Sequence, residues 1–221
     1  VAIHEPVSLS CNDHVLVSLD AQGHATLSPQ NVLQGNYDVA FYTVEAFNIQ
    51  GQNLGNQLDC SLIGQSLTYR VTDTCSGNSC WGNLRVEDKM PPFLACEEIF
   101  FSCAVSDYSP DYLLQNLGIV AGYPQVSDNC GAFTLTYTDQ FFNLSCAQPL
   151  NGVAVSSAFL RRDWHATDAA ENISTCAQII YFVRRHLSDV HFPADTTISC
   201  QNPSTSTVFT GSPYITEYGH N

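Results

Sequence analysis

The chain contains two related stretches of sequence, and the second repeats the first after about 95 residues. Three pairs of matching residues carry this offset, at separations of 95, 96 and 97 positions: Asp73 with Asp168, Cys80 with Cys176, and Cys103 with Cys200. A unit of that length is one small domain, because the units of a solenoid usually have ~20–50 residues. Arrays of similar domains extend, space or present something, so we look for function first in assembly and binding.

The chain is rich in cysteine, with ten in 221 residues. They fall in strand-like segments and turns, which is typical of the disulfide framework of an extracellular protein. Covalent links suit domains this small, because each has limited room for a hydrophobic core. The sequence leaves the pairing open, and we expect the partner of Cys200 in a third repeat that the chain only begins. The ten expected disulfide positions are Cys11, Cys60, Cys75, Cys80, Cys96, Cys103, Cys130, Cys146, Cys176 and Cys200.

Seven basic residues against 21 acidic ones give the chain a formal net charge of −14. A phosphate backbone would be repelled, so we exclude nucleic acid as a partner. No run of about 18 apolar residues occurs, so no segment is expected to span a membrane. The chain opens at Val1 without an initiating Met, which we interpret as a processed form or a segment of a longer protein.

The hydrophobic pattern predicts an all-β fold. Many short segments alternate apolar and polar residues, and Gly, Pro and Asn separate them at regular intervals, as in a β-sandwich. Pro91 and Pro92 cannot donate ladder hydrogen bonds, so they mark a stiff linker. We therefore predict tandem, disulfide-stapled, immunoglobulin-like β-sandwich domains at residues 1–90 and 91–190. Residues 191–221 are predicted to begin a third module or to form an intersubunit strand segment.

Three local patterns predict specific elements. Residues 15–19 and 25–27 are expected to form a hairpin with Gly23 in its turn. Residues 28–33 begin with Ser-Pro, which is typical of the cap and first position of a short helix. A second short helix is expected at residues 111–117.

Motifs of the second module follow one another in a fixed order: VSDNCG at residues 126–131, LTYTD at 135–139, RDWHATD at 162–168 and TCAQII at 175–180. Together they resemble the hyalin-repeat (HYR) type of immunoglobulin-like domain that recurs in very large secreted proteins of Bacteroidetes. Residues 77–82 and 86–92 of the first module resemble a companion module of the same proteins. The resemblance covers nearly all of residues 1–200.

This resemblance implies a multi-domain protein of the bacterial cell surface, often an adhesin or a filament component, exported by the type IX route. One departure concerns the turn after Asp168. Related repeats often read Asp-Ala-Cys-Gly-Asn there, whereas this chain has Ala170 at the cysteine position. We therefore carry no disulfide pairing over from the family.

The motifs of common enzymes are missing from the sequence. It contains no Gly-x-Ser-x-Gly elbow, no His-Glu-x-x-His and no phosphate-binding Gly loop. Cys75 and Cys80 could supply half of a zinc site, but no second Cys/His pair follows at matching spacing, so a disulfide at or near this turn is favoured. We expect no enzymatic activity and no obligatory cofactor.

Calcium is the metal that the carboxylates suit best. Several acidic residues fall at predicted strand ends or domain junctions, where converging carboxylates would suit a hard cation that takes six to eight oxygens. The simpler interpretation, which we favour, is that each Asp caps its own turn. The candidate ligands are Asp73, Asp88, Asp128, Asp168 and Glu171.

Short motifs also suggest glycosylation. Asn143 and Asn172 begin Asn-x-Ser sequons, and Thr196 lies in an Asp-Thr-Thr motif that resembles the O-glycosylation signal of Bacteroidetes.

The function predicted from the sequence is structural or adhesive, in a cell-surface filament, sheath or long adhesin outside the cell. The expected partners are further repeats of the same chain or copies of it, and residues 194–221 are a candidate for strand addition to a neighbouring subunit. The alternative is a module that binds surface glycans through exposed aromatic side chains.

Overall fold

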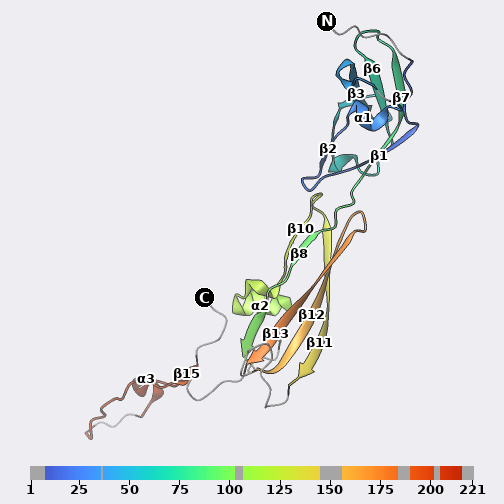
Figure 1. Ribbon diagram of the computed structural model, residues 1–221. Helices are drawn as coiled ribbons and strands as arrows, with labels where there is room; N and C mark the ends of the chain where they lie inside the picture. The colour runs from blue at the N-terminus through green and yellow to red at the C-terminus, as the bar shows by residue number, and fades with distance from the viewer. Residues whose placement is uncertain are drawn as a thin grey trace. The chain divides into compact units, whose positions relative to one another are not determined.

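The computed structural model describes residues 8–35, 37–102, 107–144, 156–183, 190–201 and 205–215 (Figure 1). The chain forms two compact units. The first contains residues 1–93 together with 127–134 and 166–174, and the second contains residues 94–126, 135–165 and 175–221. The domain boundaries predicted at residues 90 and 190 remain a prediction.

The first unit is a β-sandwich. Its main sheet has five strands in the order β1-β7-β6-β3-β4, and β2 and β5 form a second sheet. The elements are β1 (His14–Ser18), β2 (His24–Thr26), α1 (Pro29–Val32), η1 (Val39–Phe41), β3 (Tyr42–Phe47), β4 (Asn53–Gly55), β5 (Gln57–Asp59), η2 (Cys60–Leu62), β6 (Leu67–Asp73) and β7 (Ser79–Glu87).

Alternation of apolar and polar residues places the core of this unit between its sheets. Along β6, Leu67, Tyr69 and Val71 are buried while the residues between them are not, because successive side chains of a strand point to opposite faces. The small sheet contributes Leu58, which is fully buried. Gly82 packs so closely that a Cβ there would collide with the ring of Tyr69.

The hairpin predicted at residues 15–27 is wrong, although its turn is present. β1 pairs with β7, and β2 pairs with β5, so the two strands enter different sheets. The turn is held by Asp20, whose carboxylate accepts the backbone N–H groups of His24 and Gln22 at 2.9 Å each. These hydrogen bonds hold the pKa of Asp20 below its ordinary value. Local sequence fixed the turn, but the choice of sheet depends on distant strands.

The second unit is built around a four-stranded sheet, in the order β11-β12-β13-β9. The elements from residue 93 onward are β8 (Phe93–Ala95), β9 (Ile99–Ser102), α2 (Pro110–Leu117), η3 (Val120–Gly122), β10 (Gln125–Ser127), β11 (Phe133–Asn143), β12 (Ser156–Asp168), β13 (Ile173–Val183), β14 (Val190–His191), α3 (Thr207–Thr210) and β15 (Tyr214–Ile215). β8 pairs with β10, and β14 pairs with β15.

Both predicted helices are present. α1 begins after Ser28 with Pro29 at its first position. In α2 the hydroxyl of Ser109 accepts the backbone N–H of Tyr112, and Gly118 ends the helix at φ 67°, a left-handed conformation that glycine adopts without strain. α2 packs on the sheet through Leu113, which is fully buried in the core of this unit.

Two buried side chains of β12, Arg162 and Trp164, make polar contacts inside the second unit. Arg162 is fully buried, and its guanidinium donates to both carboxylate oxygens of Asp139 at 2.8 Å and to the carbonyl of Tyr108 at 3.0 Å. The indole N–H of Trp164 donates to Gln178 at 3.1 Å. Trp164 is 1% exposed and is therefore buried.

The two units repeat one topological feature. In each, an early strand pairs in parallel with the last long strand: β1 with β7, and β9 with β13. A disulfide repeats with it, because Cys11–Cys80 and Cys96–Cys176 each join the segment before the early strand to the last strand. A third disulfide, Cys60–Cys130, joins η2 to residues 127–134 within the first unit. The predicted all-β, disulfide-stapled sandwich class is confirmed.

Two cysteines differ from the expectation. Cys75 and Cys200 are free and exposed, so the structure does not place them in disulfides. Cys75 lies in the β6–β7 turn, whereas Cys80 lies on β7 and reaches Cys11 across the sheet edge. Cys103 and Cys146 lie outside the described residues.

Candidate metal centre

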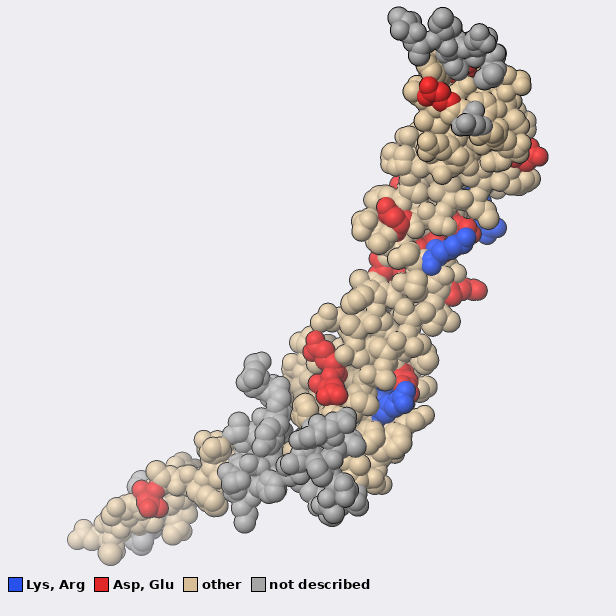
Figure 2. Space-filling view, in the orientation of Figure 1, with Lys and Arg blue, Asp and Glu red and all other residues tan. Residues whose placement is uncertain are grey.

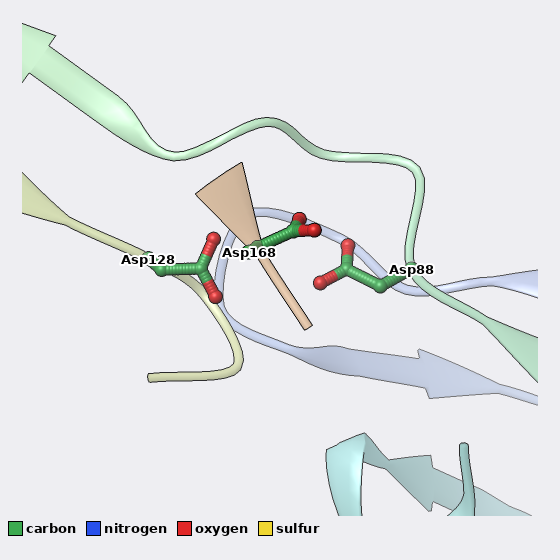
Figure 3. Close-up of side chains that lie close together, drawn as sticks. All are labelled: Asp88, Asp128 and Asp168. Carbon is green, nitrogen blue, oxygen red and sulfur yellow. The ribbon is translucent and has the colours of Figure 1, made fainter. Parts of the chain in front are cut away.

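Three carboxylates from distant parts of the sequence meet in the first unit (Figure 3). One oxygen each of Asp88, Asp128 and Asp168 lies within 4.8 Å of the others. Asp88 and Asp168 are only 6% and 7% exposed, and Asp128 is half-buried. Figure 3 shows the carboxyl groups of Asp88 and Asp128 turned toward each other, with Asp168 between them.

Asp88 follows the end of β7. Its Oδ1 accepts the backbone N–H of Met90 at 3.0 Å and the side-chain amide of Asn129 at 3.1 Å. Lys89, the next residue, directs its ammonium group to Glu87 at 2.6 Å. The carboxylate of Asp88 is therefore held by neutral donors.

Asp128 follows β10 and shapes the loop that contains Cys130. Its Oδ2 accepts the backbone N–H groups of Cys130 and Gly131 at 2.9 and 3.0 Å. Its Oδ1 is buried and has no hydrogen-bond partner. A buried carboxylate oxygen without a donor costs free energy, and a cation would remove that cost.

Asp168 ends β12 and caps the turn that leads into β13. Its Oδ1 accepts the backbone N–H groups of Ala170 and Asn172 at 2.8 Å each, and its Oδ2 accepts the side-chain amide of Asn172 at 2.8 Å. The same amide donates to the backbone carbonyl of Asp88 at 3.2 Å. Asn172 therefore ties the turn of Asp168 to the segment of Asp88.

Two asparagines thus brace the cluster, and the sequence analysis missed this role for both. Asn129 donates to Asp88 and also to the carbonyl of Asp20 at 3.2 Å. The sequence did hold one sign of this role, because each Asn lies close to a candidate ligand: Asn129 follows Asp128 directly, and Asn172 lies four residues after Asp168.

The other candidate ligands lie elsewhere. Asp73 is 1% exposed and caps its own turn, with Oδ1 accepting the N–H of Cys75 at 2.8 Å and Oδ2 accepting the hydroxyl of Ser76 at 2.7 Å. Asp168 caps the corresponding turn of the second repeat in the same way. Glu171 is exposed, has φ 68° and does not belong to the cluster. Asp168 therefore both caps its own turn and belongs to the carboxylate cluster, whereas Asp73 only caps its own turn.

Two of the candidate glycosylation residues are exposed, Asn143 at the end of β11 and Thr196. Asn172 is different, because its amide nitrogen already makes the two hydrogen bonds at the cluster. A sugar on that nitrogen would leave a single N–H, so one of these bonds would be lost.

Charged groups are sparse on the visible face of the molecule (Figure 2). Most of it is neither acidic nor basic, and the visible Lys and Arg side chains lie beside Asp or Glu. This arrangement offers no basic patch on that face. Among the described residues, no helix is long and apolar enough to cross a membrane.

These features define a class, a tandem β-sandwich protein that is stapled by disulfides and contains a cluster of buried and half-buried carboxylates. No protein-family model and no curated protein matches the chain. Among solved structures, the chain is similar to human mucin-like protocadherin EC1-2, with 14% identity over 80% of this chain and 99% of that one, at a TM-score of 0.28.

Two further similarities are of the same low level. The N-terminal four Ig domains of Dscam1 isoform 7.44 have 8% identity over 81% of this chain, at a TM-score of 0.30, and the match spans 52% of their length. Drosophila N-cadherin EC1-3 has 9% identity over 81% of this chain and 67% of that one, at a TM-score of 0.27. Nothing about function follows from similarities this low.

Proposed function

We propose that the chain is part of an extracellular structural or adhesive protein, in a cell-surface filament, sheath or long adhesin, and that it bears tension. The observation that carries this proposal is the order of the disulfides along the chain. Cys11–Cys80 and Cys96–Cys176 close loops of 69 and 80 residues, one after the other.

A force applied to the two ends of such a chain passes through covalent bonds. It enters at Cys11, crosses to Cys80, runs through the 16 residues to Cys96, and crosses to Cys176. The chain enclosed by each loop is outside this path, whereas β7 after Cys80 and β13 after Cys176 lie on it. Only hydrogen bonds among the enclosed strands are therefore free of load. Because both loops are closed covalently, the residues inside them cannot extend even where the sheets are only marginally stable.

Single-molecule stretching between residues 1 and 221 tests this proposal. With disulfides intact, the two loops stay closed, so their 149 residues (69 and 80) do not extend. With reductant, they add about 520 Å of contour length at ~3.5 Å per residue. Equal contour lengths in both conditions would contradict the tension path.

Negative-stain images of native material without filaments, sheaths or surface-bound chains would contradict the structural role.

The proposal includes the resemblance to HYR-type domains and with it a bacterial cell surface and type IX export. What supports it is that the motifs of this resemblance lie at structurally important points. VSDNCG supplies Asp128 and Cys130, and RDWHATD supplies Arg162, Trp164 and Asp168.

We further propose calcium as the ion for the carboxylate cluster. Its donors are all oxygens, which suits a hard cation. Binding there would join the segments of Asp88, Asp128 and Asp168 and would neutralise like charges that repel one another at this distance.

Calcium should therefore raise the thermal stability of the chain. At a concentration 100 times its Kd, the ion adds about 2.7 kcal/mol to the free energy of unfolding. Asp128→Asn should abolish the calcium-dependent rise in Tm in a calorimetric titration, because it removes a charged ligand and keeps the size of the side chain. Asp13→Asn, a change at an exposed acid outside the cluster, should leave the rise intact. A rise of equal size in both variants would argue against the site.

Two finer predictions remain proposals. The described end of the segment proposed for strand addition already pairs within the chain, since Tyr214–Ile215 forms a ladder with Val190–His191. Strand donation to a neighbour would therefore require that short ladder to open. Glycan binding through exposed aromatic side chains also remains an alternative, and a glycan array would test it.

A further inference from the structure

Strand β11 is the longest edge strand among the described strands, and its residues from Leu135 onward belong to the second unit. It has eleven residues, Phe133–Asn143, and it stands at one end of the order β11-β12-β13-β9. Within the described part of the chain it therefore has a strand neighbour, β12, on one side only. An edge of this length presents unpaired backbone N–H and C=O groups, which are a template for another strand.

Two common protections of an edge strand, Pro and Lys, are missing from β11. Its sequence is FTLTYTDQFFN. Its single charged residue, Asp139, is neutralised by the two 2.8 Å hydrogen bonds from Arg162. The edge is thus electrically neutral on a chain whose net charge is −14. Two copies of such an acidic chain repel each other least where they present neutral surfaces.

Aromatic side chains line this edge. Phe133, Tyr137 and Phe141 lie on one face of the strand at four-residue intervals and are 38%, 41% and 50% exposed. Phe142, on the other face, is 39% exposed. Exposed apolar groups gathered on one strand mark an interaction surface, because burying them releases water.

We propose that β11 pairs in antiparallel fashion with β11 of a second copy of this chain, about a two-fold axis at Thr138. In this register all eleven residues have a partner. Leu135 lies opposite Phe141, and Asp139 lies opposite Tyr137 of the other copy, so no two carboxylates face each other directly. The two four-stranded sheets become one continuous sheet of eight strands.

What favours a second copy over an unrelated strand is the electrical neutrality of this edge on an acidic chain, because charge repulsion between two copies is weakest there. The two-fold axis places each apolar side chain opposite an apolar, Thr, Asn or Asp side chain of β11 in the other copy, and the contact is isologous, as in most homodimers. The proposal is independent of the tension path, so a strictly monomeric chain would overturn it and leave the proposed structural function untouched.

Cysteine cross-linking tests the register. In a Cys75→Ser/Cys200→Ser background, Thr138→Cys places two thiols directly opposite each other, at a Cα separation of about 4.5–5.5 Å that suits a disulfide. Mild oxidation should convert the chain to a covalent dimer, and peptide mass spectrometry should identify the introduced bond. Thr134→Cys is the matched control, because its counterpart lies eight positions away along the strand, about 27 Å, and should not cross-link.

Sedimentation equilibrium supplies a second measurement. The unmodified chain should reach the mass of two chains as concentration rises, and Thr138→Lys should shift it to the mass of one, because two ammonium groups would face each other. Thr68→Lys, at an exposed position of β6, should keep the dimer. A monomer at every concentration overturns the proposal. So does a dimer that Thr138→Lys leaves intact, or one in which Thr138→Cys and Thr134→Cys cross-link equally.

Discussion

Arg162→Ala is expected to lower the free energy of unfolding by about 3–5 kcal/mol, because it empties the site of a large, fully buried side chain and removes the countercharge of Asp139, which is itself 27% exposed. The guanidinium is fully buried, bridges Asp139 and the carbonyl of Tyr108, and lies 4.5 Å from the centre of the Tyr137 ring. Its removal leaves the Asp139 carboxylate without its countercharge and opens a cavity beside Trp164. Urea denaturation followed by Trp fluorescence measures the change.

The neighbouring arginine is the matched control. Arg161 also contacts an acid, Asp163, at 2.9 Å, but its side chain is 49% exposed. Exposed pairs contribute about 0.2–1 kcal/mol, so Arg161→Ala should change stability by less than about 1 kcal/mol. Equal effects of the two substitutions would contradict a structural role for the buried network.

A double replacement distinguishes charge from packing. One nitrogen of the Arg162 guanidinium, Nη1, is buried without a hydrogen-bond partner. Because burying charges is costly, Arg162→Met combined with Asp139→Leu should recover most of the loss. If the double variant were as unstable as Arg162→Ala, the cavity rather than the unpaired charge would be the cause.

Removing the Cys11–Cys80 disulfide is expected to cost a similar amount, about 4 kcal/mol. The bond closes a loop of 69 residues, and the chain-entropy model gives roughly that value for a loop of this length. Cys11→Ser/Cys80→Ser should therefore lower the urea midpoint strongly. Cys75→Ser, at a free and exposed thiol on the neighbouring turn, should leave it unchanged.

A small loss of stability would contradict the prediction for this disulfide. If the double serine variant lost less than about 1 kcal/mol, the first unit would owe its stability to its core alone, and the repeated disulfide would not be its staple. Calorimetry with and without reductant should reproduce the difference on the unmodified chain.

The elements that the sequence predicted correctly depend on nearest neighbours in the chain. Period-two alternation predicted short strands throughout, a pattern that β3 and β6 show, and Ser28-Pro29 predicted the start of α1. Each of these signals operates within about ten residues, so no distant partner is needed to read it.

The carboxylate cluster could be predicted from the sequence only in part. All three members of the cluster were among the candidate calcium ligands, although turn capping was the favoured interpretation, because Asp at a strand end is a local signal. The sequence also named Asp73, whose local setting is the same as that of Asp168. What separates the two is the segment that packs against each turn, and that segment lies far away in the sequence.

By itself, the sequence determined the all-β class, the repeat, and a framework of cysteines that staples small domains. Only the tertiary structure decided that Cys80 pairs with Cys11, that β1 and β2 enter different sheets, and that Asp88, Asp128 and Asp168 meet. The physical reason is that strand alternation and turn chemistry are local. Pairing of strands and thiols depends on which distant segments the packed core brings within a few ångströms.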